Sequence, residues 1–189
     1  MKGEVKSTGL WLVAAALAIV LGGCWSYVSR EAQHRFESRE KPFSVTVYPV
    51  DVVLGDRVEH DEELGAKLVT FLRDEGLADP VSGTAEIDVP VDWQGNEARM
   101  AQLSANAFAA EVKKSGIKTD YALLAQILGN GEETWVGGVH FYLSDRAGKL
   151  ADGGLSNSDW PDFKEVRPHD RRGGYEVLLR LLRSSWRRR

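Results

Sequence analysis

The 189-residue sequence contains only one cysteine, Cys24. A lone thiol excludes an internal disulfide and the Cys-x-x-Cys pairs of redox proteins and structural zinc sites. The sequence also lacks the His-Glu-x-x-His zinc motif and the Gly-x-Ser-x-Gly nucleophile motif. Gly129 and Gly131 do not form a phosphate loop, because a third glycine is missing and a strand pattern follows them. We therefore predict no metal, no cofactor and no enzymatic activity.

Neither sign of charge is in large excess. The chain has 24 basic and 28 acidic side chains, for a net charge of −4. This mild acidic balance argues against a nucleic-acid partner. Long apolar runs are also scarce: residues 10–21 are too short for the roughly 20 residues of a membrane-spanning helix.

What the N-terminal region does contain is the pattern of a secretory signal. Lys2 and Lys6 precede the apolar stretch, and small residues follow it. The sequence Leu21-Gly22-Gly23-Cys24 resembles the bacterial lipobox, whose cysteine is diacylated and becomes the first residue of the mature protein. The resemblance implies a signal peptide over residues 1–23 and lipidation of Cys24. An uncleaved anchor extending to residue 28 is the alternative.

A lipidated Cys24 implies a protein anchored to the cell membrane or the outer membrane, with its domain on the periplasmic or extracellular side. Residues 24–42 are mostly polar and of mixed charge, and Pro42 closes them. We predict that they form the lipidated end and a tether. A short helix over residues 31–39, packed on the domain, is the alternative.

Periodicity in residues 43–189 alternates between strand and helix. Strands are expected at 43–54, 86–93, 121–128, 135–143 and 149–155, with helices at 61–76, at 96–114 and from Tyr175 onward. The nearly continuous apolar run at 121–128 is typical of a strand covered on both faces. We predict a single α/β domain, a mixed sheet of about five strands packed by three helices.

Three short motifs resemble a known group of envelope domains: the N-terminal domain of TolB and the LpoB and CsgG folds. They are a first strand that ends at a proline (residues 45–50), an Ala-Asp-Tyr-type segment (residues 119–124) and a hairpin turn (residues 145–150). The resemblance covers roughly residues 44–182 and departs from the group at residues 86–91 and 157–172. It implies docking on envelope proteins or assembly into channels, without an active site.

Histidine chemistry is the main alternative to a binding role. The four histidines, which are far apart in the sequence, are His34, His60, His140 and His169. His140 could act as a base beside Asp145 or Asp152, or it could be an ordinary polar side chain on a strand. The ordinary side chain is the favoured interpretation.

An acidic run and an aromatic loop are the next candidates. The run is formed by Asp56, Glu59, Asp61, Glu62 and Glu63. It has the oxygen ligands of a cation site but not the calcium-loop pattern, so we favour a solvated helix start. Trp160 and Phe163 lie in a polar loop and are candidate partner contacts, but a loop folded over the sheet by these two aromatics is the favoured interpretation.

The C-terminal helix carries a basic face with Arg180, Arg183 and Arg187, and Trp186 beside it. The favoured interpretation is that the cations complement the negative end of the helix dipole. The alternative is membrane contact by these four residues, through anionic headgroups and the interfacial preference of tryptophan.

Together these observations predict a cell-envelope lipoprotein that acts as a non-enzymatic protein-binding or assembly module at the membrane surface. Its partners are the membrane and either an envelope protein or further copies of itself; no small-molecule ligand is identified. The alternatives are an enzyme that uses His140 with nearby carboxylates, and a channel or scaffold subunit.

Overall fold

The computed structural model describes residues 28–39, 42–87, 89, 96–132 and 135–187. Its elements, in chain order, are α2 (Arg30–Glu37), β1 (Ser44–Val47), β2 (Val50–Leu54), β3 (Arg57–Asp61), α3 (Glu62–Asp74), β4 (Asp79–Ser82), α4 (Glu97–Ser115), β5 (Tyr121–Gly129), β6 (Val136–Asp145), β7 (Leu150–Asn157), α5 (Pro161–Val166) and α6 (Arg171–Arg187).

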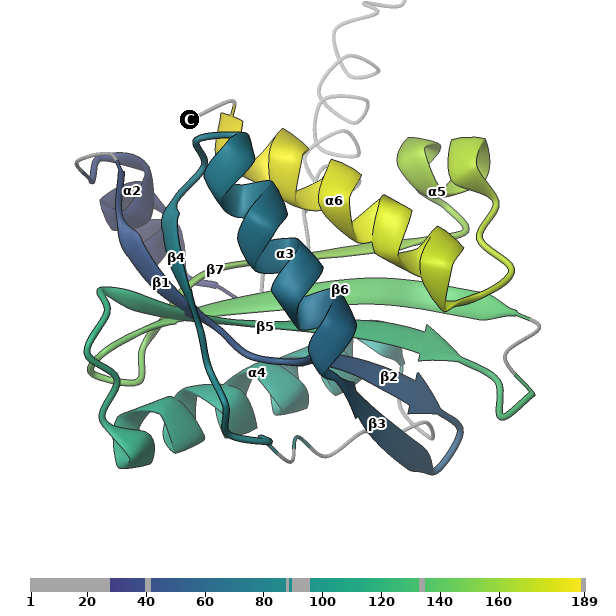
Figure 1. The fold of residues 1–189 in the computed structure, drawn as a ribbon, viewed down its shortest axis with the longest axis horizontal. Helices are drawn as coiled ribbons and strands as arrows, with labels where there is room; N and C mark the ends of the chain where they lie inside the picture. The colour runs from purple at the N-terminus through teal and green to yellow at the C-terminus, as the bar shows by residue number, and fades with distance from the viewer. Residues whose placement is uncertain (1–27, 40–41, 88, 90–95, 133–134, 188–189) are drawn as a thin grey trace, which may run out of the picture.

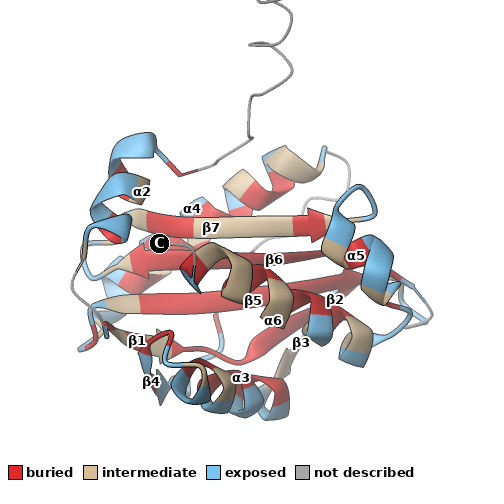
Figure 2. Cartoon of the chain, turned by 90° about the horizontal axis from the view of Figure 1, so that it is seen from above, coloured by how far each residue is buried: buried red, intermediate tan, exposed pale blue. Residues whose placement is uncertain are grey.

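One mixed sheet lies between two layers of helices (Figure 1 and Figure 2). α3 and α6 cover one face, where their apolar side chains form the larger core together with α2 and α5. α4 covers the other face and a second core. The predicted α/β class and mixed sheet are confirmed. The described residues hold seven strands and five helices rather than about five and three.

β5 is the central strand, as its apolar sequence predicts. It pairs in parallel with β1 near its start and with β2 near its end, and antiparallel with β6 along its other side. Every β5 residue after Tyr121 is buried. Helices on both faces explain this burial, and therefore the absence of a polar alternation.

The predicted strand at 43–54 is two strands, β1 and β2, separated by Tyr48 and Pro49. Proline has no N–H to donate to a neighbouring strand, so the ladder is interrupted there. Tyr48 N–H still bonds to the carbonyl oxygen of Leu123 at 3.0 Å. The two strands therefore follow the same side of β5.

Two short strands occupy segments where the sequence predicts none. β3 forms a hairpin with β2, through a turn in which Gly55 has the positive φ of 67° that glycine tolerates. β4 lies parallel to β1, where Asp79-Pro80 and Ser82-Gly83 predict only turns. Pro80 is compatible with a strand here because β4 is at an edge of the sheet.

The predicted strand at 86–93 is wrong for the described part of that segment. Residues 83–87 have no regular secondary structure. Ile87 and Val89 are nevertheless buried in the core under α4, which accounts for their apolar character. The remaining residues of this prediction lie outside the described residues.

The helix limits follow the capping residues. The Asp61 carboxylate accepts the Leu64 N–H at the start of α3, and the Asn96 side chain accepts the Arg99 N–H at the start of α4. Gly116 ends α4 with a φ of 68°. The predicted helices at 61–76 and 96–114 are confirmed.

α6 begins at Arg171, four residues before the predicted start, and its buried side chains include Val177, Leu178, Leu181, Leu182 and Trp186. α5 forms within the segment predicted to be a polar loop. Residues 30–37, assigned to the tether, form α2, whose Phe36 is buried in the larger core. That part of the tether prediction is corrected in favour of a packed helix, because Phe36 has apolar surface to bury.

None of the helices in the described ranges is both long and apolar enough to cross a bilayer. The signal peptide, Cys24 and the tether before residue 28 lie outside the described residues, so those predictions stand as predictions.

Candidate functional site

A row of polar side chains crosses the sheet beneath α4. In the strand register Asp51 of β2 lies opposite both His60 of β3 and Gln126 of β5. Gln126 in turn lies opposite His140 of β6. Four strands therefore place polar residues at one level of the same face.

The side chains of this row are hydrogen-bonded in sequence. Asp51 Oδ1 is 2.9 Å from His60 Nδ1, and the Gln126 amide donates to Asp51 Oδ2 at 3.3 Å. The Tyr142 hydroxyl donates to Gln126 Oε1 at 2.9 Å. His140 Nδ1 is 3.0 Å from that hydroxyl.

Glu97, in the first turn of α4, ends the row. Its Oε1 is 3.1 Å from His140 Nε2, and its Oε2 accepts from the Asn157 amide at the end of β7. Burial alone would raise the pKa of Glu97, but the hydrogen bonds from His140 and Asn157 outweigh it and hold the pKa below its usual value. Glu97 is therefore a carboxylate at neutral pH.

Both ring nitrogens of His140 have a partner inside the protein. Nδ1 lies 3.0 Å from the Tyr142 hydroxyl oxygen, and Nε2 lies 3.1 Å from Oε1 of Glu97. The ring is therefore held from both sides.

The row also divides the apolar packing under α4. Tyr142 belongs to the larger cluster on this face, while Val53, Met100 and Leu128 form a separate small cluster. Burial raises the pKa of the Tyr142 hydroxyl, which stays protonated at any physiological pH. The polar row thus separates two hydrophobic regions that α4 covers.

His140 has none of its side-chain surface exposed, so it cannot contact a substrate in this structure. Neither of the carboxylates expected beside it is its partner: Asp145 accepts backbone N–H groups of the β6–β7 turn, and Asp152 accepts the Trp186 indole. The favoured interpretation of His140, a satisfied side chain on a strand, agrees with this geometry. His34 and His169 are exposed.

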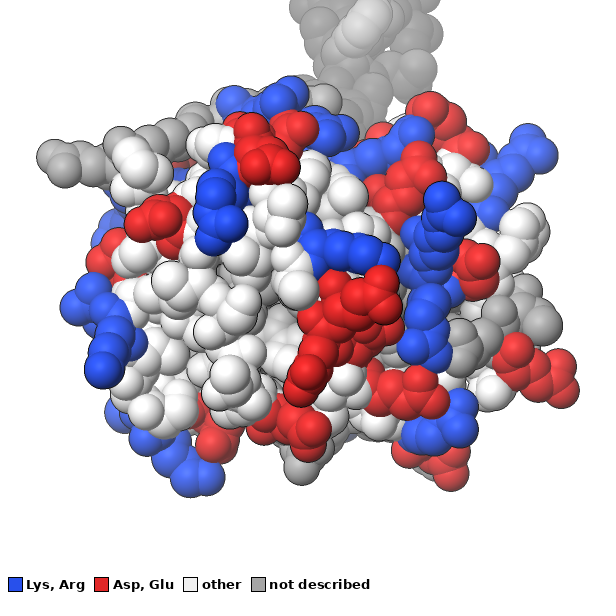
Figure 3. Space-filling view, in the orientation of Figure 1, with Lys and Arg blue, Asp and Glu red and all other residues white. Residues whose placement is uncertain are grey.

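The acidic run is shared between a helix cap and an ion-pair cluster. Asp61 caps α3, and the Arg171 guanidinium bonds to Glu59 at 2.8 Å and to Asp61 at 3.2 Å. Figure 3 shows carboxylates gathered on this face with basic side chains next to them. Within the described ranges no three His, Cys, Asp or Glu side chains are placed to hold a metal ion.

Two tryptophans are exposed at the end of the sheet that holds the start of β6 and the end of β7. Trp135, just before β6, is 55% exposed and its ring lies over Gly137. Trp160, the N-cap residue of α5, is 47% exposed. Large exposed aromatic side chains are typical of protein contact surfaces.

Trp160 and Phe163, the two aromatic residues of the predicted loop, differ in their exposure to solvent. Trp160 is exposed, as a partner contact requires, but Phe163 is 7% exposed and packs in the larger core. Phe163 is therefore corrected from a contact residue to an anchor of α5. Trp135 was missed because it is the first residue of the predicted strand at 135–143, and the strand pattern gives no sign of its exposure.

The arginines of α6 lie in ion pairs with nearby acidic residues. Arg180 contacts Glu165 and Glu176, each at 2.9 Å. Arg183, at 3.1 Å, and Arg187 both contact Glu75 at the end of α3. The Arg183 hydrogen bond holds the pKa of Glu75 below its usual value. These pairs support a structural role, and membrane contact by the arginines stands as a prediction.

Trp186 is not available for membrane contact. It is 1% exposed, and its Nε1–H donates to Asp152 Oδ2 at 3.0 Å. Its ring packs against Phe36, Phe43 and Phe141. The predicted interfacial role of Trp186 is wrong because the indole closes the core between α2 and the sheet.

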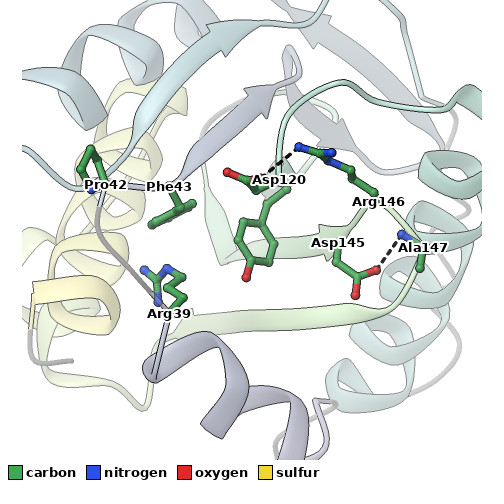
Figure 4. Close-up of a pocket in the computed structure, with 8 residues that line it drawn as sticks. Arg39, Pro42, Phe43, Asp120, Asp145, Arg146 and Ala147 are labelled. Carbon is green, nitrogen blue, oxygen red and sulfur yellow. Dashed lines mark hydrogen bonds and ion pairs between the residues drawn. The ribbon is translucent and has the colours of Figure 1, made fainter.

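A cavity of about 560 Å³ opens at the same end of the sheet as α2 (Figure 4). Three segments line it: the chain that leads from α2 into β1, the start of β5, and the β6–β7 turn. Its charged side chains are Arg39, Asp120, Asp145 and Arg146. The cavity thus combines cations and carboxylates, and no motif in the sequence marks it because its lining comes from three distant segments.

No family model matches the chain, and no curated protein matches it. Among solved structures, the LpoB C-terminal domain from Escherichia coli is similar with a TM-score of 0.35 and 12% sequence identity. The match covers 70% of this chain and 96% of that domain.

Proposed function

We propose that this chain is a lipid-anchored cell-envelope protein whose α/β domain binds another envelope protein without catalysing a reaction. The proposal places the lipid on Cys24 and the partner on the surface formed by Trp135 and Trp160. The lipobox-like sequence supports the anchor, and the two exposed tryptophans support the contact surface.

This proposal rests on the separation between the anchor and the two tryptophans, which lie near opposite ends of the sheet. Cys24 precedes the first described residue, Val28, by four residues, a reach of at most about 14 Å. α2, which follows, lies at the end of the sheet near the β6–β7 turn, while α5 lies at the opposite end (Figure 1). Because β6 spans ten residues, or about 33 Å, an anchored domain could hold the tryptophans well away from the bilayer.

Site-specific crosslinking in cells tests the contact surface. A photoreactive phenylalanine analogue replaces Trp135 or Trp160 in the full-length chain, and each variant is irradiated in intact cells. We expect the same adduct from both positions, because a single partner would cover both side chains. Leu103, an exposed apolar residue of α4, provides the matched control and should give no adduct.

Two results would overturn the partner proposal. Different adducts, or none, from the two tryptophan positions would remove the shared surface. An adduct of twice the mass of the chain would replace the envelope protein with a second copy of this protein.

The anchor is tested separately by growth with an alkyne-tagged palmitate. The wild-type chain should be labelled, and Cys24→Ser should not be. Labelling that survives the substitution would contradict lipidation at Cys24.

A further inference from the structure

A second hollow, of about 220 Å³, lies between the start of α3 and the end of β4. Its apolar floor includes Val47, Pro49 and Gly65, all of which are buried. The volume is below the roughly 300 Å³ at which pockets for free small molecules begin. This size suits one long side chain of a larger molecule rather than a free metabolite.

Two glycines let the walls of the hollow pack closely on the sheet. A Cβ at Gly65 would lie 3.1 Å from the Cα of Pro49, and a Cβ at Gly83 would lie 2.9 Å from Cγ2 of Thr46. Glycine within a helix is less favourable than alanine, so its presence inside α3 marks a requirement for this close approach. The shape of the hollow therefore depends on both glycines.

Glu62 is the one charged residue among the described residues that line the hollow. It is exposed and forms no ion pair with a described residue, whereas its neighbour Glu63 pairs with Lys67 at 2.6 Å. The side chains of Ser82 and Thr84 also line the hollow and add hydroxyl oxygens. A carboxylate and hydroxyl acceptors together match an ammonium group, which offers three donors.

The surface next to the hollow carries little charge. Figure 3 shows an area without charged side chains over β4 and the adjoining side of α3. Ala66 and Thr70 of α3 and Val81 of β4 are exposed uncharged residues of these two elements, and Val81 is 48% exposed. Exposed apolar surface of this kind is typical of contact sites. A segment that lies along β4 would contact this surface as well as the hollow.

β4 is an edge strand, but it does not offer a regular ladder for the addition of another strand. Pro80 has no N–H, and its carbonyl oxygen accepts from Arg73 Nη2 at 3.4 Å. A bound segment would therefore be held through its side chains. The Arg73 cation also disfavours a second positive charge at that end of the surface.

We propose that the hollow binds a lysine side chain from an extended segment of a protein partner, with the ammonium group at Glu62. The methylene groups of lysine would cover the floor at Val47 and Pro49, as long cationic side chains do on apolar surfaces. Lysine fits better than arginine because an ammonium directs its donors to separate acceptors, whereas a guanidinium holds them in one plane. A free amine would leave Val81 uncovered, which favours a lysine within a longer chain.

Titration of the full-length chain in a nonionic detergent, followed through the NMR signals of the backbone amides, tests this proposal. The probes are the peptide acetyl-Ala-Lys-Val-Ala-amide and the same peptide with norleucine, which keeps the aliphatic chain and lacks the ammonium. We expect the lysine peptide to shift the amides of Gly65, Ala66, Gly83 and Thr84 saturably. It should bind about threefold to fivefold more tightly than the norleucine peptide, as expected for one exposed ion pair.

Three variants separate the charge, the space and the fold. Glu62→Gln should weaken the lysine peptide by the same factor and leave the norleucine peptide unchanged. Ala66→Leu should fill the hollow and abolish binding of both peptides, and its thermal midpoint should stay near that of the wild type because residue 66 is exposed. Glu63→Gln is the matched control, since this adjacent carboxylate is paired with Lys67, and it should change neither affinity.

Equal affinities of the two peptides, an unchanged affinity in Glu62→Gln, or no saturable shift at millimolar peptide would overturn the proposal. Shifts of the same amides on dilution of the protein alone would assign the hollow to a second copy of this chain instead of a partner. None of these outcomes bears on the crosslinking at Trp135 and Trp160 or on the labelling of Cys24. The lysine site and the proposed function can therefore fail independently.

Discussion

Glu97 connects three elements through one carboxylate. It belongs to α4, and its two oxygens bond to His140 on β6 and Asn157 on β7. Hydrogen bonds to a charged group contribute about 1.5–3 kcal/mol, more than neutral ones. Glu97 therefore fixes the start of α4 on the sheet, and its contribution depends on ionisation.

We predict that Glu97→Gln lowers the free energy of unfolding by about 1–3 kcal/mol at pH 7. Because the pKa of Glu97 is lower in the folded state, its contribution is present above its unfolded pKa of about 4.3 and is lost as the pH falls through the folded value. The difference between variant and wild type should therefore shrink at pH 3.5. Urea denaturation at both pH values measures it.

Glu111→Gln is the matched control for this measurement. Glu111 lies on the same helix, and its ion pair with Lys114 is exposed. Its effect should be small at both pH values. A Glu97→Gln effect that is equal at pH 7 and pH 3.5 would contradict the role assigned to the carboxylate.

Trp186 provides a second prediction for a single residue. Trp186→Phe removes the hydrogen bond to Asp152 and leaves unfilled volume in the core, so we expect a loss of about 2–4 kcal/mol of unfolding free energy. Trp160→Phe, at an exposed position, should change it by less than about 0.5 kcal/mol. Thermal and urea denaturation compare the two. If Trp186→Phe left the free energy of unfolding unchanged, the indole would not be part of the core.

Single residues were predictable where their role is local. Asp61, Asn96 and Gly116 act as caps or terminators within a few residues of their own position, so the sequence identifies them. Asp51 and Gln126 are polar residues in apolar strands, which is a visible signal. Their partners are not visible, because strand pairing joins residues far apart in the chain.

At the scale of elements, α6 approaches β5 closely enough to require glycine. A Cβ at Gly174 would lie 2.6 Å from Cγ2 of Ile127, a buried side chain of β5. Alanine favours a helix over glycine by about 1 kcal/mol, but overpacking a core costs about 1–3 kcal/mol. The steric effect should exceed the gain in helix propensity.

We therefore predict that Gly174→Ala destabilises the protein by about 1–2 kcal/mol. Gly131→Ala, at a position with no atom near the added Cβ, should be nearly neutral. Urea denaturation at pH 7 measures both. A stabilised Gly174→Ala would show that α6 can move away from β5 at little cost.

Elements with their own periodicity were predictable, and those that depend on neighbours were not. α3, α4 and β5 are long enough to show their pattern. β3 and β4 have five and four residues and exist through pairing with β2 and β1. The described part of the alternating segment at 86–93, residues 86, 87 and 89, gives the opposite error, because Ile87 and Val89 pack under α4 without forming a strand.

At the scale of the whole molecule, the two ends of the sheet differ in composition. One end holds α2, the β6–β7 turn and the aromatic cluster around Trp186; the other holds the two exposed tryptophans. The charge balance and the apolar patterns predicted one domain but not this difference. It arises only when strands place distant segments at the same end.

The difference between the ends predicts an orientation on the bilayer. With Cys24 acylated, a cysteine introduced at Lys149 or Trp160 is the sole free thiol for a spin label. Lys149 lies in the β6–β7 turn and Trp160 beyond β7, so the two labels are about 30 Å apart. We expect nickel-chelating lipids to relax the label at residue 149 much more strongly than the label at residue 160.

Relaxation of both labels to the same extent would contradict a fixed orientation. Stronger relaxation at residue 160 would reverse it and would place the tryptophans against the membrane. The wild-type chain, whose single cysteine is acylated, is the control for background labelling.

The row from His60 to Glu97 has a consequence for how the strands find one another during folding. Sliding β5 by one residue along β2 would turn its apolar side chains to the wrong face, and hydrophobicity alone rejects that alignment. Sliding it by two residues preserves the faces, but it would set Asp51 opposite Leu124 or Leu128 instead of Gln126. The buried Gln126 amide would then lose the Asp51 carboxylate that accepts from it, and a buried donor left without an acceptor costs about 1–3 kcal/mol. The buried polar groups thus select one strand register among those that the alternation of apolar and polar residues would allow.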